Sequence, residues 1–259
     1  MHTAFDPPAC RRARLPVRRC PACFAPVGLL AVRCGACAYP LNGRYGGGET
    51  GGLAMGTVLA GRYVVGRCLQ SMDGERVYAG FDRRTKRIVR LTAAAAEERE
   101  RTDLLCRARA LLGLAGCQAI ATPDEVWLER DWLVAVSSAP DKPFCDGGRS
   151  IGDAEMRRCL ARLTDALLVI HSLGAQPDGD AVHGAPCAES LLLAEDGALR
   201  LALPLLPRTG EPADDIRGFG GVLLPLGTAL SPAVEAILRR MCAGGYASVL
   251  EIKHELNCL

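Results

Sequence analysis

Two short segments near the N-terminus, CPACFAPV at residues 20–27 and CGACAYPL at residues 34–41, determine the structure of the first part of the chain. They match at both cysteines, at the alanine between them, at the proline and at a final aliphatic residue. Each segment contains a CxxC turn, which directs two thiolates toward one point. Two copies of the same turn predict one pseudo-symmetric site.

The two turns predict a structural zinc site in a small zinc ribbon, with Cys20, Cys23, Cys34 and Cys37 as ligands. Four thiolates complete a tetrahedral shell and leave no position open for water. A unit of this size cannot bury an adequate apolar core, so the metal would supply much of its folding free energy. One alternative is cysteines buried by chance, which the doubled spacing disfavours. A redox CxxC is also disfavoured, because that motif is expected beside a βαβ unit.

The composition indicates a globular protein with room for one large and one small domain. The chain has 259 residues, of which 49% are hydrophobic and 23% charged, enough to bury a full core. No apolar run approaches the roughly 18 to 20 residues of a membrane helix, and no signal peptide is evident. Thirteen cysteines without an export signal favour a reducing compartment. We therefore predict a cytoplasmic protein without membrane association, whose other cysteines are small packing residues.

The N-terminal part is strongly basic. Residues 1–45 contain seven arginines and one acid, Asp6, a net charge of +6, whereas the whole chain has only +2. This excess predicts weak, salt-dependent contacts with nucleic acid or another anionic partner through the arginines. The alternative is a solvated tail, and it is favoured because few aromatic residues lie between the arginines.

A glycine-rich segment, GGGETGG at residues 46–52, marks a domain boundary. Its glycines offer maximal backbone freedom and little to pack, which is typical of a flexible linker. The sequence thus predicts a basic arm and zinc ribbon over 1–45, a linker over 46–58 and a main domain over 59–259.

The main domain is predicted to be α+β, with strands first and mostly helices afterwards. Three strands are expected at 61–69, 75–82 and 86–92, and a hairpin at 125–136. A helix rich in Ala, Leu, Glu and Arg is expected over 94–114. The later elements are a long helix at 154–174, two strands at 190–194 and 198–203, and helices near 215–226, 231–242 and 247–256.

Several strings between residues 59 and 256 resemble a bacterial serine/threonine protein kinase. They are LAGRYVVGRCL with VYAGFD, WLVAV, LLVIHSLG, VHGAPCAESLLLAEDGALRLAL and DDIRGFGGVLL. LAGRYVVGRCL with VYAGFD is similar to the strands around the family's glycine-rich loop, WLVAV to the strand before the hinge, and LLVIHSLG to the helix before the catalytic loop. VHGAPCAESLLLAEDGALRLAL is similar to the catalytic and metal-binding loops, and DDIRGFGGVLL to a core helix that buries an aspartate. The resemblance implies a shortened bilobal domain, with an N-lobe at about 59–138 and a C-lobe at about 139–259.

The catalytic groups of that family are missing from the positions that the resemblance assigns to them. Phosphoryl transfer by the family requires loop glycines, a phosphate-binding lysine, a catalytic aspartate and metal ligands. The segment before the core helix is also too short for a peptide-substrate platform. The residues at these positions are Gln70, Met72 and Glu75 for the glycines, Leu91 or its neighbours Arg90 and Thr92 for the lysine, Ala185 for the aspartate, and Ser190 and Leu203 for the metal ligands.

Two residues are expected to keep structural roles, His183 in the catalytic-loop segment and Asp215 in the core helix. A lone histidine among apolar residues is more often a packing residue than a base. The resemblance therefore implies a catalytically inactive regulator or scaffold that binds a protein partner, with structural zinc and without ATP or magnesium. Two alternatives stay open: a divergent active kinase that recruits Asp178, Asp180 or Glu189, and a nucleic-acid-binding zinc-ribbon protein.

Overall fold

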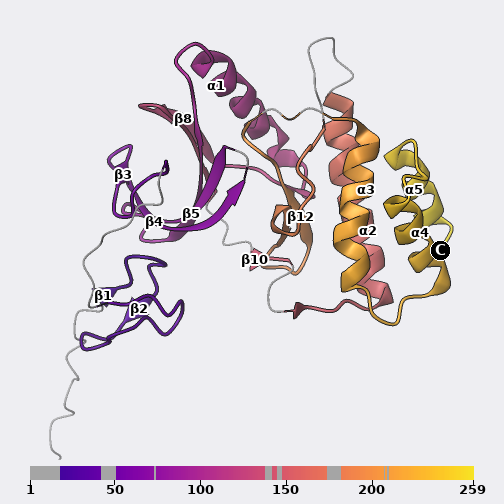
Figure 1. Cartoon of the computed structure of the whole chain (residues 1–259), viewed down its shortest axis with the longest axis horizontal. Coiled ribbons are helices and arrows are strands. Elements are labelled where there is room, and N and C mark those ends of the chain that lie inside the picture. The colour runs from indigo at the N-terminus through magenta and orange to yellow at the C-terminus, as the bar shows by residue number, and fades with distance from the viewer. Residues whose placement is uncertain are drawn as a thin grey trace, which may run out of the picture.

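The computed structural model describes residues 18–41, 51–72, 74–137, 142–144, 148–173, 182–206, 208 and 210–259. Within them, a small four-cysteine unit precedes a six-stranded antiparallel sheet, and a smaller sheet and a group of helices complete the fold (Figure 1). The fold is therefore α+β, as the sequence predicts. Most of the basic arm and residues 42–50 lie outside the described residues.

The four-cysteine unit is built on one short ladder. β1 (Arg18–Arg19) pairs antiparallel with β2 (Pro26–Val27). Its small core consists of two cysteines and three apolar side chains: Cys20, Ala22, Val27, Cys34 and Leu41. Such a core is too small to stabilise the unit without a further source of free energy.

Six antiparallel strands form a curved, near-barrel sheet (Figure 1). From one edge to the other they are β3 (Val58–Leu59), β4 (Tyr63–Met72), β5 (Glu75–Asp82), β6 (Ile88–Ala95), β9 (Trp132–Ser137) and β8 (Glu125–Glu129). Alternation along the strands places Tyr63, Val65, Tyr78 and Leu91 in one buried cluster. The three strands and the hairpin predicted for this region are all present.

The helix predicted at 94–114 is shorter than expected. α1 covers Arg101–Ala110 and continues in a 3-10 turn at Leu111–Gly116. The prediction is wrong for Ala94 and Ala95, which extend β6 and pair with β9. Alanine favours helices by less than about 1 kcal/mol per residue, and pairing with a central strand outweighs that preference here.

A smaller sheet lies between the six-stranded sheet and the helices (Figure 1). Its strands, in order, are β10 (Lys142–Pro143), β11 (Leu191–Leu193), β12 (Leu199–Ala202) and β7 (Ile120–Ala121). β7 comes before the β8–β9 hairpin in the chain, but it pairs in parallel with β12, where Ile120 lies opposite Leu201. A piece of the predicted N-lobe segment thus belongs to the second sheet.

The described residues after 150 form four α-helices, α2 (Asp153–Leu173), α3 (Pro212–Leu223), α4 (Pro232–Cys242) and α5 (Val249–Asn257). Met156, Leu160, Leu163 and Leu167 recur on one face of α2 and are buried in the largest core of the protein. No helix in the described part of the chain is long and apolar enough to cross a membrane.

The end of the predicted linker, 46–58, packs on the six-stranded sheet. The amide of Leu53 donates a hydrogen bond to Tyr78 Oη at 2.9 Å. Met55 packs against the core of the four-cysteine unit. Residues 51–58 therefore link the small unit to the sheet covalently and also through non-covalent contacts with both.

Candidate metal centre and the pocket between the two sheets

The four cysteines of the CxxC turns come together in one cluster. Their sulfur atoms all lie within 4.8 Å of one another. The Sγ atoms of Cys20 and Cys37 are 3.8 Å apart, and those of Cys23 and Cys34 are 3.7 Å apart. Sulfurs at about 2.3 Å from a tetrahedral zinc ion are separated by about 3.8 Å. The cluster therefore has the dimensions of a structural zinc site.

The two turns share one backbone geometry. The amide of Phe24 donates to Cys20 O, and the amide of Ala38 donates to Cys34 O, both at 2.8 Å. Phe24 and Ala38 have φ values of 59° and 57°, so the sequence repeat is also a structural one. Burial raises the pKa of the Cys34 thiol, but adjacent backbone amides outweigh burial and lower that pKa to about 7. Burial instead raises the pKa values of the Cys23 and Cys37 thiols.

The four-cysteine unit is fixed to the six-stranded sheet. The amide of Arg67 on β4 donates to Ala22 O at 2.9 Å. The Phe24 ring stacks on Phe81, with ring centroids 5.5 Å apart and an interplanar angle of 28°. A Cβ atom on Gly66 would lie only 2.5 Å from Ala22 O, so the close approach requires glycine. The left-handed conformation of Phe24 costs free energy that the aromatic stack offsets.

A buried polar hub joins α3 to the segment before β11. Asp215 Oδ2 accepts from the amide of His183 at 2.7 Å, and Asp215 Oδ1 accepts from the amide of Gly184 at 2.8 Å. His171 Nε2, at the end of α2, lies 3.0 Å from Asp215 Oδ2. Burial raises the pKa of Asp215, but these hydrogen bonds outweigh burial and hold the pKa below its usual range.

The His183 ring is fixed by both of its nitrogen atoms. Nε2 donates to Ala202 O at 2.8 Å, because a carbonyl only accepts, and Nδ1 then accepts from the amide of Ala185 at 3.3 Å. The ring lies edge-on to Phe219 at a centroid distance of 5.1 Å. Burial lowers the pKa of His183, so the ring is neutral at pH 7. A histidine whose two nitrogens are both occupied has no free position at which to take up a proton.

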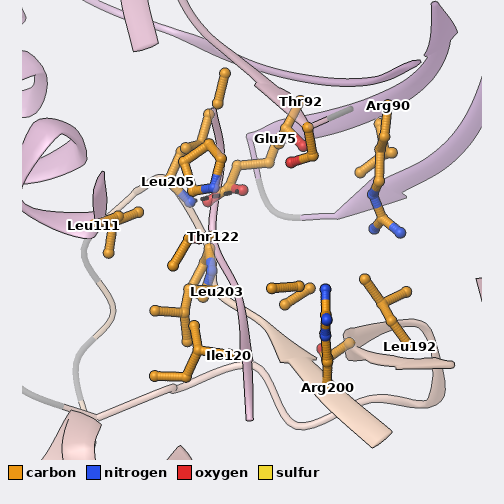
Figure 2. Close-up of a pocket in the computed structure, with 18 of the residues that line it drawn as sticks. Glu75, Arg90, Thr92, Leu111, Ile120, Thr122, Leu192, Arg200, Leu203 and Leu205 are labelled. Carbon is orange, nitrogen blue, oxygen red and sulfur yellow. Dashed lines mark hydrogen bonds between the residues drawn. The ribbon is translucent and has the colours of Figure 1, made fainter. Parts of the chain in front are cut away.

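A cavity of about 240 Å³ lies between the two sheets. Figure 2 shows Arg90 from β6 and Arg200 from β12 extending into it from opposite walls. Thr92 and Thr122 add hydroxyl groups to the lining, and Leu203 adds an apolar side chain. The pocket is therefore of mixed polarity.

The predicted kinase-like positions do not all face this pocket. The residues that do line it are Gln70, Met72, Glu75, Ser190 and Leu203. Ala185 lies behind the lining, where its carbonyl accepts from Ser190 Oγ at 3.1 Å. Leu91 is fully buried on the opposite face of β6. Leu91 is one of three candidates for the lysine position. Because side chains alternate along β6, the other two candidates, Arg90 and Thr92, face the pocket.

Glu75 clamps the tip of the β4–β5 hairpin to the segment after β12. Its Oε2 accepts from the amide of Leu205 at 3.0 Å (Figure 2). Its Oε1 accepts from the amide of Leu206 at 2.7 Å. Arg208 Nη2 lies 3.6 Å from Glu75 Oε1. Burial raises the pKa of Glu75, whereas the two amides and Arg208 oppose that rise. The resemblance places Glu75 at a glycine position of the family, but the clamp depends on a contact with a residue 130 positions away in the chain.

A second contact holds the same hairpin tip. The Sγ atom of Cys187 lies 3.4 Å from Met72 Sδ. Cys187 Sγ is also 2.9 Å from Ser190 Oγ at the floor of the pocket. The β4–β5 hairpin tip thus contacts two segments of the chain, the one after β12 through Glu75 and the one before β11 through Met72.

Replacing Glu75 by glutamine is expected to weaken the clamp. The glutamine side chain can accept only at its single amide oxygen, so one of the two backbone amides loses its partner, at a cost of about 1–3 kcal/mol. We expect a lower midpoint of chemical denaturation and faster hydrogen exchange at Leu205 and Leu206. Glu97→Gln is the matched control, because Glu97 is exposed. Equal behaviour of both variants would show that the clamp contributes nothing.

Neither a scan of protein-family models nor a search of curated proteins finds a match to this chain. The geometry of the site therefore provides the basis for any functional conclusion.

Proposed function

We propose that this chain is a catalytically inactive, kinase-like regulator or scaffold that carries a structural zinc ribbon and acts by binding a protein partner. The order of its elements supports the kinase-like part: five long strands, with a helix after the third, precede a mainly helical half. The Asp215 hub is further support, because the resemblance implies a core helix whose aspartate lies beneath the catalytic-loop segment.

The observation that carries the inactive part of the proposal is the Glu75 clamp. In the resemblance, Glu75 stands at a glycine of the phosphate-covering loop, and Leu205 lies two residues after Leu203, which stands at the position of a metal ligand. The carboxylate of Glu75 accepts from the amides of Leu205 and Leu206. This contact supports a loop that is closed on the place where the family binds phosphates. Phosphoryl transfer requires positioned glycines and metal ions at this point.

The groups around the clamp support the same conclusion. Ser190 and Leu203 occupy the metal-ligand positions, and Leu203 offers no oxygen ligand for magnesium. None of the described residues that line the pocket is a lysine. Among the acids proposed as substitutes, Glu189 lies at the pocket, while Asp178 and Asp180 are outside the described residues.

The test is a phosphoryl-transfer assay with radiolabelled ATP, magnesium or manganese, and generic protein substrates. We expect no label in protein, because the lysine, the aspartate and the metal ligands act as a unit and are lost together. A variant with alanine at Asp178, Asp180 and Glu189 serves as the control. Label that the wild type incorporates and this variant does not would contradict the proposal and favour a divergent active kinase.

A further inference from the structure

The loop between the two CxxC turns carries an exposed apolar tip. In the segment GLLAV, residues 28–32, the exposed fractions are 50% for Leu29, 95% for Leu30 and 61% for Val32. The tip has a fixed shape, because the amide of Ala31 donates to Gly28 O at 3.1 Å. Contiguous apolar side chains that a folded unit holds in solvent mark a binding surface.

Arginines flank the base of this tip. Arg18 lies opposite Val27, the residue before the tip, in the β1–β2 ladder, and its Nη2 donates to Leu41 O at 3.0 Å, which holds the guanidinium at the base of the tip. Arg33 directly follows the tip, and its backbone forms an antiparallel β-bridge with Pro40. Residues 18–41 contain three arginines and no aspartate or glutamate. The unit that carries the apolar tip, residues 18–41, therefore has arginines as its only charged side chains.

We propose that the tip, residues 28–32, inserts into the headgroup region of an anionic lipid membrane, while Arg18 and Arg33 contact lipid phosphates. Apolar insertion and attraction of basic residues are each weak, and reversible membrane binding takes both together. Such a protein lies on the membrane and needs no spanning helix.

The shape of the tip favours a membrane over a protein partner. A standard protein interface buries about 800 Å² on each side and seats its anchors in pockets of the partner. Three side chains on one narrow loop supply much less area than that. A fluid bilayer requires no complementary pocket and accepts a convex wedge. The charge fits as well, because the surface of an anionic leaflet attracts arginines within a Debye length.

This inference reverses the expectation of no membrane association. In the sequence, GLLAV is an apolar run of the kind that usually belongs to a core. In the structure Val27 and Leu41 belong to the core of the small unit and Ala31 packs against it, whereas Leu29, Leu30 and Val32 are exposed.

The test uses the full chain with its zinc and sedimentation with vesicles of phosphatidylcholine, with or without phosphatidylserine. We expect binding to the phosphatidylserine vesicles only, and about tenfold weaker binding for Leu30→Asp because a charge must then enter the apolar layer. Arg33→Ala should weaken binding about fivefold. Leu250→Asp is the matched control and should bind as the wild type does, because Leu250 is a 63% exposed leucine on α5.

Three outcomes would overturn the inference. The first is no sedimentation with anionic vesicles, as expected if the tip binds an acidic protein instead. The second is equal losses for Leu30→Asp and Leu250→Asp. The third is binding that needs phosphatidylserine but not Leu30, which would mean adsorption by the arginines alone. Zinc content is measured for each variant to show that the unit is folded, and Leu30→Trp gives a second readout, since brominated lipid should quench its fluorescence.

Discussion

Removal of the metal is expected to unfold residues 18–41 and release them from the six-stranded sheet. The core of this unit is five small or medium side chains, and its four sulfurs lie within 4.8 Å of one another. Structural zinc contributes about 10 kcal/mol or more to units of this kind near pH 7, far more than this core can supply. Hydrogen exchange by mass spectrometry should show full loss of protection over 18–41 after chelation.

The contact with the sheet should be lost at the same time. The amide of Arg67 is protected by Ala22 O, so it should exchange faster once the unit unfolds. Elemental analysis should give one zinc per chain for the wild type and for Cys106→Ser, since Cys106 is an exposed cysteine of α1. Cys23→Ser should lose the metal and behave as the chelated protein does. Retained protection over 18–41 without metal would contradict the prediction.

The four-cysteine cluster could be predicted from sequence because it depends on local spacing. Two residues between the cysteines of a pair fix the turn, and the repeat fixes the second turn in the same form. Val27 and Leu41 could be expected in its core from the same repeat. The docking on the sheet could not be predicted, because Phe24 and Phe81 meet only after β4 and β5 have formed. A bulky residue at a left-handed position gives no signal in the sequence itself.

Much of the larger fold was also accessible from periodicity, and the exceptions have physical reasons. The apolar spacing of α2 and the alternation of β4 to β6 are strong signals that tertiary contacts reinforce. Ala94 and Ala95 were assigned to a helix because intrinsic propensity was the only information available, whereas their strand pairing comes from β9. β7 is two residues long and pairs with a strand about 80 residues later, so no local pattern indicates it.

The candidate pocket shows the same division between local and distant information. Side chains alternate along β6, so Leu91 lies on one face of the strand and Arg90 and Thr92 on the other. This separation could be predicted from the sequence once the strand and its register were known. The Glu75 clamp needs the approach of segments 130 residues apart and has no sequence pattern. The sequence thus indicated several residues that line the pocket, but it did not indicate the hydrogen bonds that these residues form.

Replacing Asp215 by asparagine is expected to destabilise the helical half of the protein by about 2–4 kcal/mol. The carboxylate accepts from the amides of His183 and Gly184 with different oxygens. An asparagine has one acceptor oxygen, and its NH₂ group would face one of these backbone donors. A buried donor then lacks a partner, and the favourable interaction of His171 with a charge is lost.

Asp214→Asn provides a control at the adjacent position, because the Asp214 side chain is 59% exposed. Among the described residues it forms only a surface pair with Arg217 and a cap bond. Chemical denaturation at neutral pH should show a loss of no more than about 1 kcal/mol for this control. The loss of stability in Asp215→Asn should also depend on pH. Because the folded state holds the pKa of Asp215 below that of the unfolded chain, its stabilising contribution is complete above about pH 5 and is lost as the pH falls through the folded pKa. The stability difference between wild type and Asp215→Asn should therefore narrow toward pH 3. A difference in unfolding free energy between wild type and Asp215→Asn that stays constant from pH 7 to pH 3 would show that Asp215 does not act through its charge.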